Sequence, residues 1–439
     1  MRQDREKMAN RMESGEKESV LARYQRIRAW TTHLCEPLEI EDMVVQSMPD
    51  VSPTKWHLAH TTWFFETFVL REHMPGYEPM DPCYEVLFNS YYNGVGEQFP
   101  RHRRGLVTRP TVKQVFEYRD HVDRHMARLL ERQGDDEALC KLVILGLNHE
   151  QQHQELLLTD IKHVLSQSPL SPIYRPLDAS THRMPGAPSV EFIQHDGGMV
   201  EVGATEQAAF FFDNERPVHQ TYLHPFALAS RPVTVGDYMA FIEDGGYTRH
   251  ELWLSQGWSW LDEEKIEAPL YWNLEALRDG EACAFTMQGE RALSPDEILT
   301  HVSMFEADAF ARWSNARLPR EHELEWAMRH LGQPEGEANF VESERYHPGP
   351  VLSTQSSPFA NLFGDVWEWT ASSYDAYPGY QPVPGALGEY NGKFMSNQYV
   401  LRGGSCATPR DHIRSSYRNF FPSSTRWQFN GLRLAKDRS

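Results

Sequence analysis

The chain has 439 residues, of which 40% are hydrophobic and 24% charged, a globular composition in a chain too long for one ordinary core. Its 43 Lys and Arg and 62 Asp and Glu give a net charge of −19, which argues against a general nucleic-acid-binding surface. The charged N-terminus lacks the apolar segment of a secretion signal, and no stretch approaches the roughly 20 apolar residues that span a bilayer. We therefore expect a cytoplasmic protein of two domains, with neither nucleic acid nor membrane as a partner.

The first part of the chain has four long segments with apolar residues at helical spacing. The pattern predicts helices over 19–35, 56–72, 111–133 and 138–165. Four such segments indicate a four-helix bundle over residues 17–166, and bundles build metal sites from inward side chains on facing helices. Residues 167–189 are rich in Ser and Pro and are expected to form a linker.

The second part, residues 190–437, has a different pattern. Its expected elements are short and separated by Gly, Pro and Asn, and Trp residues are frequent, which is typical of an irregular α+β domain. The five cysteines are an odd number without a C-x-x-C pair, so neither a disulfide framework nor a zinc–thiolate site is expected.

The strongest chemical signal is the string His149-Glu-Gln-Gln-His153. Residues i and i+4 of a helix lie one above the other, so both rings can reach one metal ion. The string matches the His-Glu-x-x-His signature of zinc metalloproteases, in which Glu150 would be the general base. A third ligand could come from His57 or His60 in the second predicted helix. Three imidazoles suit catalytic zinc or non-heme iron, and the ligand set alone does not distinguish them.

Two groups of motifs together resemble one family. The strings 56–65 (Trp-His-Leu-Ala-His-Thr-Thr-Trp-Phe-Phe) and 149–153 are similar to the DinB-type iron domain of ergothioneine sulfoxide synthases, the EgtB family. The strings 317–326, 364–369 and 402–405 resemble the formylglycine-generating-enzyme module, which has a C-type-lectin-like fold. The resemblance implies an N-terminal DinB-like four-helix bundle followed by a C-type-lectin-like domain.

The resemblance also implies the reaction. The family couples a cysteine-type thiol to hercynine (Nα-trimethylhistidine), using Fe(II) and O2, and gives a sulfoxide in ergothioneine biosynthesis. Carried to this chain, it implies that His60, His149 and His153 bind Fe(II) and that His57 does not. Cysteine and γ-glutamylcysteine remain alternative donors. A related selenoneine- or ovothiol-type synthase is an alternative function, and a zinc metallohydrolase is a more remote one.

The resemblance implies that the adjacent tyrosines Tyr91 and Tyr92 are catalytic. Their chemistry agrees, because a phenol can supply a proton beside reduced oxygen. Another branch of the family takes its tyrosine from the second domain, near Tyr374, Tyr377 or Tyr380 here. The alternative role for Tyr91 and Tyr92 is ordinary aromatic packing.

The resemblance places hercynine at Gln152, Asn419, Phe420 and Phe421. Aromatic faces suit a quaternary ammonium, although Phe420 and Phe421 could instead be simple core residues. The formylglycine reaction needs a close pair of cysteines, whereas Cys406 has no neighbour of that kind in sequence. We therefore expect Cys406 to be a small buried residue.

The carboxylate of the thiol donor requires a cation. The basic cluster at 101–104 supplies Arg101 and Arg104, which are candidate donor-binding residues because they lie between the tyrosines and the third predicted helix. A solvated surface cluster is the alternative interpretation. Arg410, Arg414 and Arg418 are further, less firmly placed, candidates for the same role.

Overall fold

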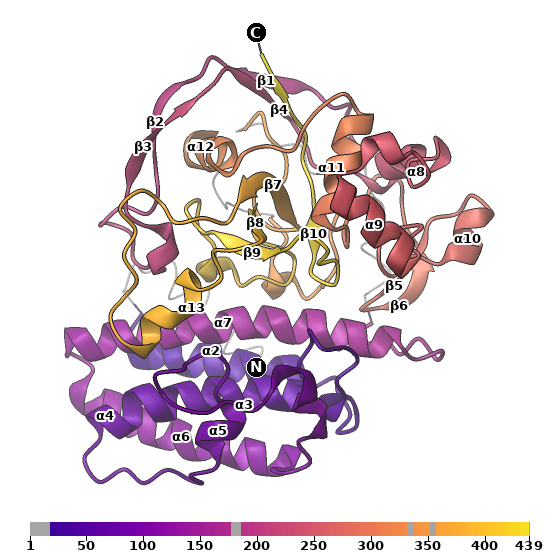
Figure 1. Ribbon diagram of the computed structural model, residues 1–439. Coiled ribbons are helices and arrows are strands. Elements are labelled where there is room, and N and C mark those ends of the chain that lie inside the picture. Colours follow the sequence, from indigo (N-terminus) through magenta and orange to yellow (C-terminus); the bar gives the residue numbers. More distant parts are fainter. Residues whose placement is uncertain (1–17, 177–185, 332–337, 352–356, 439) are drawn as a thin grey trace.

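The structure is a computed structural model that describes residues 18–176, 186–331, 338–351 and 357–438. A helical part forms one layer of the molecule and a mixed part of short helices and strands lies against it, with one long helix, α7, along their boundary (Figure 1). Within the described residues, no helix has both the length and the apolar character that crossing a bilayer requires.

The four predicted long helices are confirmed, and capping residues explain where three of them begin. The side chains of Ser19, Thr111 and Asp136 accept hydrogen bonds from the first turns of their helices. The second helix begins two residues earlier and ends one residue later than predicted, and it includes a π-helical turn that the pattern did not indicate. The helices are α2 (Val20–Cys35), α3 (Thr54–Phe64) with η2 (Phe65–Leu70) and α4 (Arg71–His73), α6 (Val112–Gln133) and α7 (Glu137–Ser166).

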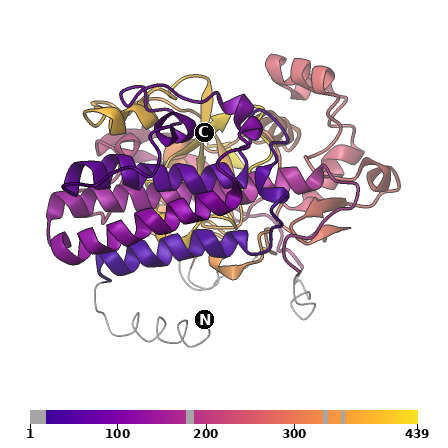
Figure 2. The same cartoon turned by 90° about the horizontal axis from the view of Figure 1, so that it is seen from below.

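These helices lie side by side (Figure 2) and bury a common apolar core. Gly146 of α7 lets α7 approach α3 closely. A Cβ atom at this position would lie 2.6 Å from a ring carbon of Phe64 and 2.7 Å from one of Phe65. The absent side chain therefore brings the turn that carries His149 up to the helix that carries His60.

Three short helices in the bundle connections were not predicted, because each is shorter than a periodic pattern can reveal. They matter for the site, because they pack against the second predicted helix, which carries His60. They are η1 (Asp42–Val44), α5 (Tyr84–Phe88) and η3 (Arg101–Leu106).

The second part has the short elements that were expected. One sheet has the order β1-β4-β11, a second has the order β10-β7-β8-β9 with β10 parallel to β7, and two hairpins pair β2 with β3 and β5 with β6. The strands are β1 (Phe192–His195), β2 (Gly198–Val202), β3 (His219–Leu223), β4 (Phe226–Ala229), β5 (Cys283–Thr286), β6 (Gly289–Ala292), β7 (Trp367–Ser373), β8 (Gln398–Arg402), β9 (Asn419–Pro422), β10 (Asn430–Gly431) and β11 (Ala435–Asp437).

Short helices surround these sheets (Figure 1). The α-helices are α8 (Val235–Glu243), α9 (Ser255–Glu264), α10 (Leu274–Arg278), α11 (Met304–Trp313), α12 (Glu321–Leu331) and α13 (Glu389–Gly392). The 3-10 helices are η5 (Asp213–Glu215), η6 (His250–Leu252), η7 (Val341–Ser343), η8 (Ala386–Gly388) and η9 (Arg410–His412).

Polar side chains of α7 join the two parts. The carboxylate of Glu155, which is largely buried, accepts hydrogen bonds from the Trp367 indole at 2.8 Å, from the Thr408 hydroxyl at 2.8 Å and from the Ser405 hydroxyl. Cys406 beside them is fully buried, as predicted. Further contacts of α7 with the second part are Gln151 to Asp411, Asn148 to His412 and Lys162 to His301.

Candidate metal centre

Three histidines from two helices converge at one point of the bundle. His60 of α3 and His149 and His153 of α7 each offer a ring nitrogen, and these atoms all lie within 4.8 Å of one another. The Nε2 atoms of His60 and His149 are 3.2 Å apart. Burial lowers the pKa of all three, to about 4 for His149 and well below 6.5 for the other two. All three are therefore neutral at pH 7, with lone pairs available to a metal.

Neighbouring groups orient two of these rings. The Nδ1 atom of His60 lies 2.5 Å from the carbonyl oxygen of Phe88, at the end of α5, and donates to it. The Nδ1 atom of His153 lies 2.9 Å from Nδ1 of His57. In both rings Nε2 is then left for the metal, an arrangement that metal-binding histidines usually have. His57 lies beside the three converging histidines and is not one of them.

The donor set fits a divalent first-row metal ion. Since Nδ1 of His60 donates to the Phe88 carbonyl, Nε2 of His60 carries a lone pair and no hydrogen. A second lone pair from His149 and a third from His153 give three neutral imidazoles at one point. Such a set suits zinc or non-heme iron and leaves coordination positions for other ligands.

Glu150 lies on α7 between two of these histidines, but its carboxylate is part of a separate cluster of buried ion pairs. It is fully buried and accepts hydrogen bonds from Arg28 and Arg119, both at 2.9 Å, and from Thr31 at 2.6 Å. Burial alone would raise the pKa of Glu150, but the two guanidinium groups lower it to about 2. A carboxylate held in this way cannot act as general base for a metal-bound water. The zinc-metallohydrolase alternative is therefore wrong in the role that it gave Glu150.

A buried cation lies next to the histidines. Arg104 is 3% exposed, and its guanidinium carbon lies 3.4 Å from the centre of the Trp56 ring, which in turn stacks on His60 at 4.6 Å. Arg104 donates to the hydroxyls of Ser52 at 2.9 Å and Ser90 at 3.0 Å. Among the described residues no carboxylate forms an ion pair with it, and burial lowers its pKa to about 9. Arg104 thus has the surroundings of a residue that binds an anionic ligand.

The two expected tyrosines lie in the same connection of the bundle. Tyr92 is 4% exposed and its ring contacts that of Trp63 at 5.7 Å, and Trp63 stacks on His60 at 5.5 Å. Tyr91 is half-buried, and its hydroxyl accepts a hydrogen bond from Arg101 at 3.0 Å. The structure therefore places Arg101 against one expected catalytic residue.

The segment 417–421 of the second part reaches α7. The Gln152 amide donates to the Tyr417 hydroxyl at 2.8 Å. Phe420 stacks on Tyr374 at 4.0 Å and lies 5.9 Å from Phe394, whose ring meets that of Tyr91 at 5.1 Å. Phe394 therefore connects an expected hercynine-binding residue with an expected catalytic one.

Other expected residues of this segment have local partners. Asn419 accepts a hydrogen bond from the Phe420 backbone at 2.9 Å, and Phe421 contacts Trp427 at 6.3 Å. Sequence reasoning missed Phe394 and its neighbour Lys393, whose ammonium donates to the Tyr91 carbonyl. Both lie in an irregular loop, where no periodicity or motif could indicate them.

The further arginine candidates are already neutralised or engaged within the second part. Arg414 pairs with Glu215, and Arg418 pairs with Glu321 at 2.9 Å. Arg410 donates to a backbone carbonyl at 2.7 Å. These contacts argue against their role as donor-binding residues. The alternative tyrosines also have polar partners: Tyr374 with Asn214, Tyr377 with Arg402 and Tyr380 with Asp213.

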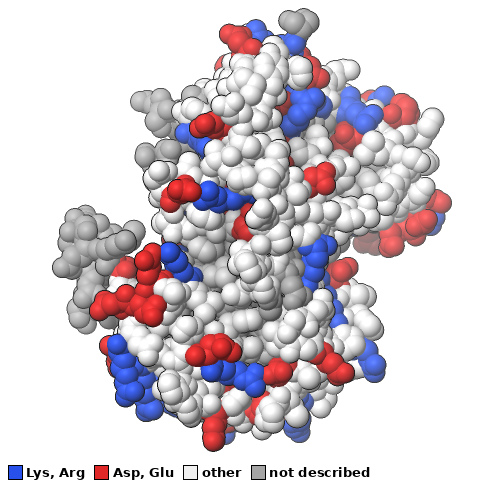
Figure 3. All heavy atoms as spheres, turned by 60° about the vertical axis from the view of Figure 1, so that its left-hand side comes forward, with Lys and Arg blue, Asp and Glu red and all other residues white. Residues whose placement is uncertain are grey.

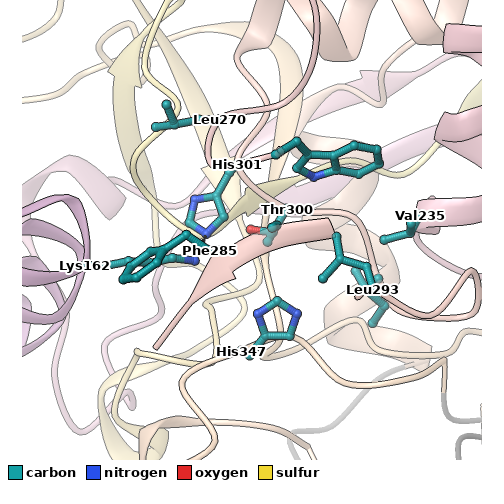
Figure 4. Close-up of a pocket in the computed structure, with 11 residues that line it drawn as sticks. Lys162, Val235, Leu270, Phe285, Leu293, Thr300, His301 and His347 are labelled. Carbon is teal, nitrogen blue, oxygen red and sulfur yellow. Dashed lines mark hydrogen bonds between the residues drawn. The ribbon is translucent and has the colours of Figure 1, made fainter. Parts of the chain in front are cut away.

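A small cavity lies farther along α7 (Figure 4), and none of the three converging histidines lines it. Lys162 points into it nine residues after His153, which is about 14 Å along a helix. Its ammonium lies 2.6 Å from Nε2 of His301, and burial lowers the pKa of Lys162 to about 7. The other lining residues come from the second part, and most of them are apolar. The cavity therefore lies where α7 meets the second part.

Among its described residues, the face of the molecule drawn in Figure 3 has no large patch of a single charge. There, Lys and Arg side chains lie among Asp and Glu side chains over both parts of the molecule.

Fold and site together define a class of protein: a DinB-type bundle with three converging histidines, joined to a sulfatase-modifying-factor-like domain. Residues 23–157 match the DinB superfamily and residues 181–438 match the sulfatase-modifying factor enzyme 1-like domain. With its relatives included, the chain belongs to the ergothioneine sulfoxide synthase family, EgtB, as its motifs predicted.

Those relatives match most of the chain. Hercynine oxygenase of Mycolicibacterium thermoresistibile is 31% identical over 418 residues, which cover 89% of this chain and 88% of the relative. Hercynine oxygenase of Mycobacterium tuberculosis is 29% identical over 96% of this chain and 99% of the relative. Ergothioneine biosynthesis protein 1 of Schizosaccharomyces pombe is 28% identical over 52% of this chain and 28% of that protein.

Proposed function

We propose that the protein is an iron-dependent sulfoxide synthase of ergothioneine biosynthesis. It joins hercynine to cysteine or γ-glutamylcysteine. One carbon–hydrogen and one sulfur–hydrogen bond are lost, a carbon–sulfur and a sulfur–oxygen bond form, and O2 supplies the sulfoxide oxygen and one water. The observation that carries the proposal is the convergence of His60, His149 and His153 in a chain whose relatives are named hercynine oxygenases.

The three neutral imidazoles would hold Fe(II), which supplies O2 activation and favours the thiolate form of the donor. The protein contributes the fixed geometry. Phe88 and His57 orient the rings of His60 and His153, and Trp56 covers one face of His60. Holding both substrates at one centre replaces encounters between three separate molecules.

The thiol donor would bind through its carboxylate at Arg104, with Arg101 nearby. A buried guanidinium without a carboxylate partner is costly, and an anionic ligand would offset that cost. The flat fork of arginine also matches a carboxylate with two hydrogen bonds.

Hercynine would lie between the two parts, at Gln152, Asn419, Phe420 and Phe421. The trimethylammonium group cannot donate strong hydrogen bonds, so aromatic faces such as that of Phe420 suit it. The contact between Gln152 of α7 and Tyr417 supports this placement, because it brings the segment 417–421 to the helix of the histidines.

Tyr91 and Tyr92 would supply a proton to reduced oxygen. Tyr92 is one ring away from His60, and Arg101 fixes the hydroxyl of Tyr91. A positioned phenol contributes on the order of 10²–10⁴-fold when it transfers a proton in the transition state.

The test is product formation by the full chain. Protein loaded anaerobically with Fe(II) receives hercynine and either cysteine or γ-glutamylcysteine, O2 is admitted, and products are identified by mass spectrometry. We expect a product with the mass of both substrates minus two hydrogens plus one oxygen. His149→Ala should lose it and His125→Ala, a histidine of α6 outside the cluster, should keep it.

The opposite result would be equally clear. Absence of coupled product with either thiol, from protein that has bound Fe(II), would refute the proposal. Product with only a selenium donor would favour the selenoneine-type alternative.

A further inference from the structure

A buried carboxylate, that of Asp160, is connected to one of the three converging histidines through His57, a histidine outside that cluster. Asp160 of α7 accepts a hydrogen bond from Nε2 of His57 at 3.0 Å, and Nδ1 of His57 faces Nδ1 of His153 at 2.9 Å. His57 and Asp160 are each 3% exposed. The order is therefore carboxylate, imidazole, metal-binding imidazole.

Among the described residues, no Lys or Arg forms an ion pair with Asp160. Its hydrogen-bond partners are the His57 ring and the backbone N–H of Ser52, the latter at 2.8 Å. A buried carboxylate that lacks Lys or Arg costs stability unless its polar contacts compensate. Burying Asp160 at this place therefore costs stability, as is typical of a functional position.

The contacts fix where the protons lie. A carboxylate accepts, so the hydrogen of His57 is on Nε2 and its Nδ1 carries a lone pair. That lone pair must accept from Nδ1–H of His153. The remaining nitrogen of His153, Nε2, then has no hydrogen and can bind a metal. In the reverse tautomer of His57, a lone pair on Nε2 would face the carboxylate of Asp160. The hydrogen on its Nδ1 would face the hydrogen on Nδ1 of His153.

We propose that His57 and Asp160 are positioning residues of the metal centre. They hold His153 as the Nδ1–H tautomer with its Nε2 lone pair directed at the metal, and they increase the basicity of that nitrogen through two hydrogen bonds. The inference rests on the proposed metal site. Outer partners of metal-binding histidines typically change metal affinity by about 10- to 100-fold when removed.

The same chain of contacts continues to the expected donor site. The hydroxyl of Ser52, whose N–H binds Asp160, accepts a hydrogen bond from Arg104 at 2.9 Å. One network therefore connects a metal-binding ring with the cation expected to hold the thiol donor.

The first experiment measures Co(II) affinity of the full chain by competition with a chromophoric chelator. We expect His57→Phe to bind Co(II) about 10- to 100-fold more weakly than wild type. His57→Gln should largely restore affinity, because its amide can donate to Asp160 and accept from His153. His125→Phe is the matched control and should bind as wild type. Wild-type affinity in a folded His57→Phe variant would overturn the proposal.

The second experiment needs no variant. Protein labelled with ¹⁵N-histidine and loaded with Zn(II) is examined by two-bond ¹H–¹⁵N correlation, which distinguishes the two tautomers. We expect a hydrogen on Nε2 of His57 and on Nδ1 of His153, and a hydrogen on Nδ1 of His57 would overturn the proposal. If wild type binds neither Co(II) nor Zn(II), the proposed metal site itself is wrong, which is a different outcome.

Discussion

The guanidinium carbon of Arg104 lies 3.4 Å from the centre of the Trp56 ring. That indole also stacks on His60, so a cation with no ion-paired carboxylate among the described residues is one aromatic ring away from a histidine of the proposed metal site. Retaining this charge costs stability, because burial disfavours the charged form. Such a cost is typical of a functional position.

Replacing Arg104 by Met should therefore separate binding from stability. We expect the KM for the thiol donor to rise about 10- to 100-fold, since a hydrogen-bonded charge pair contributes roughly 1.5–3 kcal/mol. The kcat should change less, and the melting temperature should stay the same or rise, because the variant removes a buried unpaired charge. Steady-state kinetics with each thiol and thermal unfolding measure both. An unchanged donor KM would show that Arg104 does not bind the donor.

Glu150→Gln should destabilise the bundle by roughly 3 kcal/mol, because it leaves Arg28 and Arg119 without their anion. The wild-type contribution should depend on pH. The folded-state pKa is about 2 and the ordinary value is 4.5, so the contribution is complete above pH 4.5 and is lost as the pH falls towards 2. Urea denaturation of both proteins between pH 3 and pH 7 tests this. Equal stability of the two at pH 7 would contradict it.

Tyr91→Phe and Tyr92→Phe should slow sulfoxide formation without weakening metal binding. We expect roughly a 10²-fold loss in the double variant, the lower end of what a positioned proton donor contributes. Single variants should show whether one phenol can replace the other. Product formation is followed by mass spectrometry and metal affinity by Co(II) competition. Tyr77→Phe, a tyrosine that donates to Glu66 elsewhere in the bundle, is the control. A double variant with the wild-type rate would assign both rings to packing.

Glu155→Ala should loosen the contact between the two parts. The substitution leaves the Trp367 indole and two hydroxyls without their acceptor, and each buried polar group left unpaired costs about 1–3 kcal/mol. We expect lower thermal stability and a higher KM for hercynine, with Co(II) affinity near wild type. Glu155→Gln, which keeps one carbonyl oxygen, should be milder in both measurements. If Glu155→Ala leaves the hercynine KM unchanged, this contact does not position the substrate segment.

The four long helices and the histidine cluster follow from local patterns, which a single sequence displays. Helical periodicity gave the helix bounds to within about two residues at most ends, and the i, i+4 spacing placed His149 and His153 together. The choice of His60 over His57 came from the family resemblance, and in the structure both ring nitrogens of His57 have other partners, His153 and Asp160.

Contacts between distant segments could not be predicted in this way. The protease-like motif suggested that Glu150 faces a metal, but Arg28 and Arg119, on two other helices, determine where its carboxylate points. Phe394 reaches Tyr91 only because an irregular loop of the second part folds over the bundle. Such juxtapositions depend on the assembled fold and leave no period or motif in the sequence.

The helix α7 belongs equally to both halves of the molecule, and this limits how the gene could be recombined. His149 and His153 are on the side of α7 that faces α3, whereas Glu155 and Gln151 contact the second part. A chimera that takes its bundle from one relative and its second half from another would combine an α7 with a surface it was not selected to fit. Transferring the residues of α7 that contact the second part, together with that part, should restore the stability of such a chimera. Exchanging loops should not.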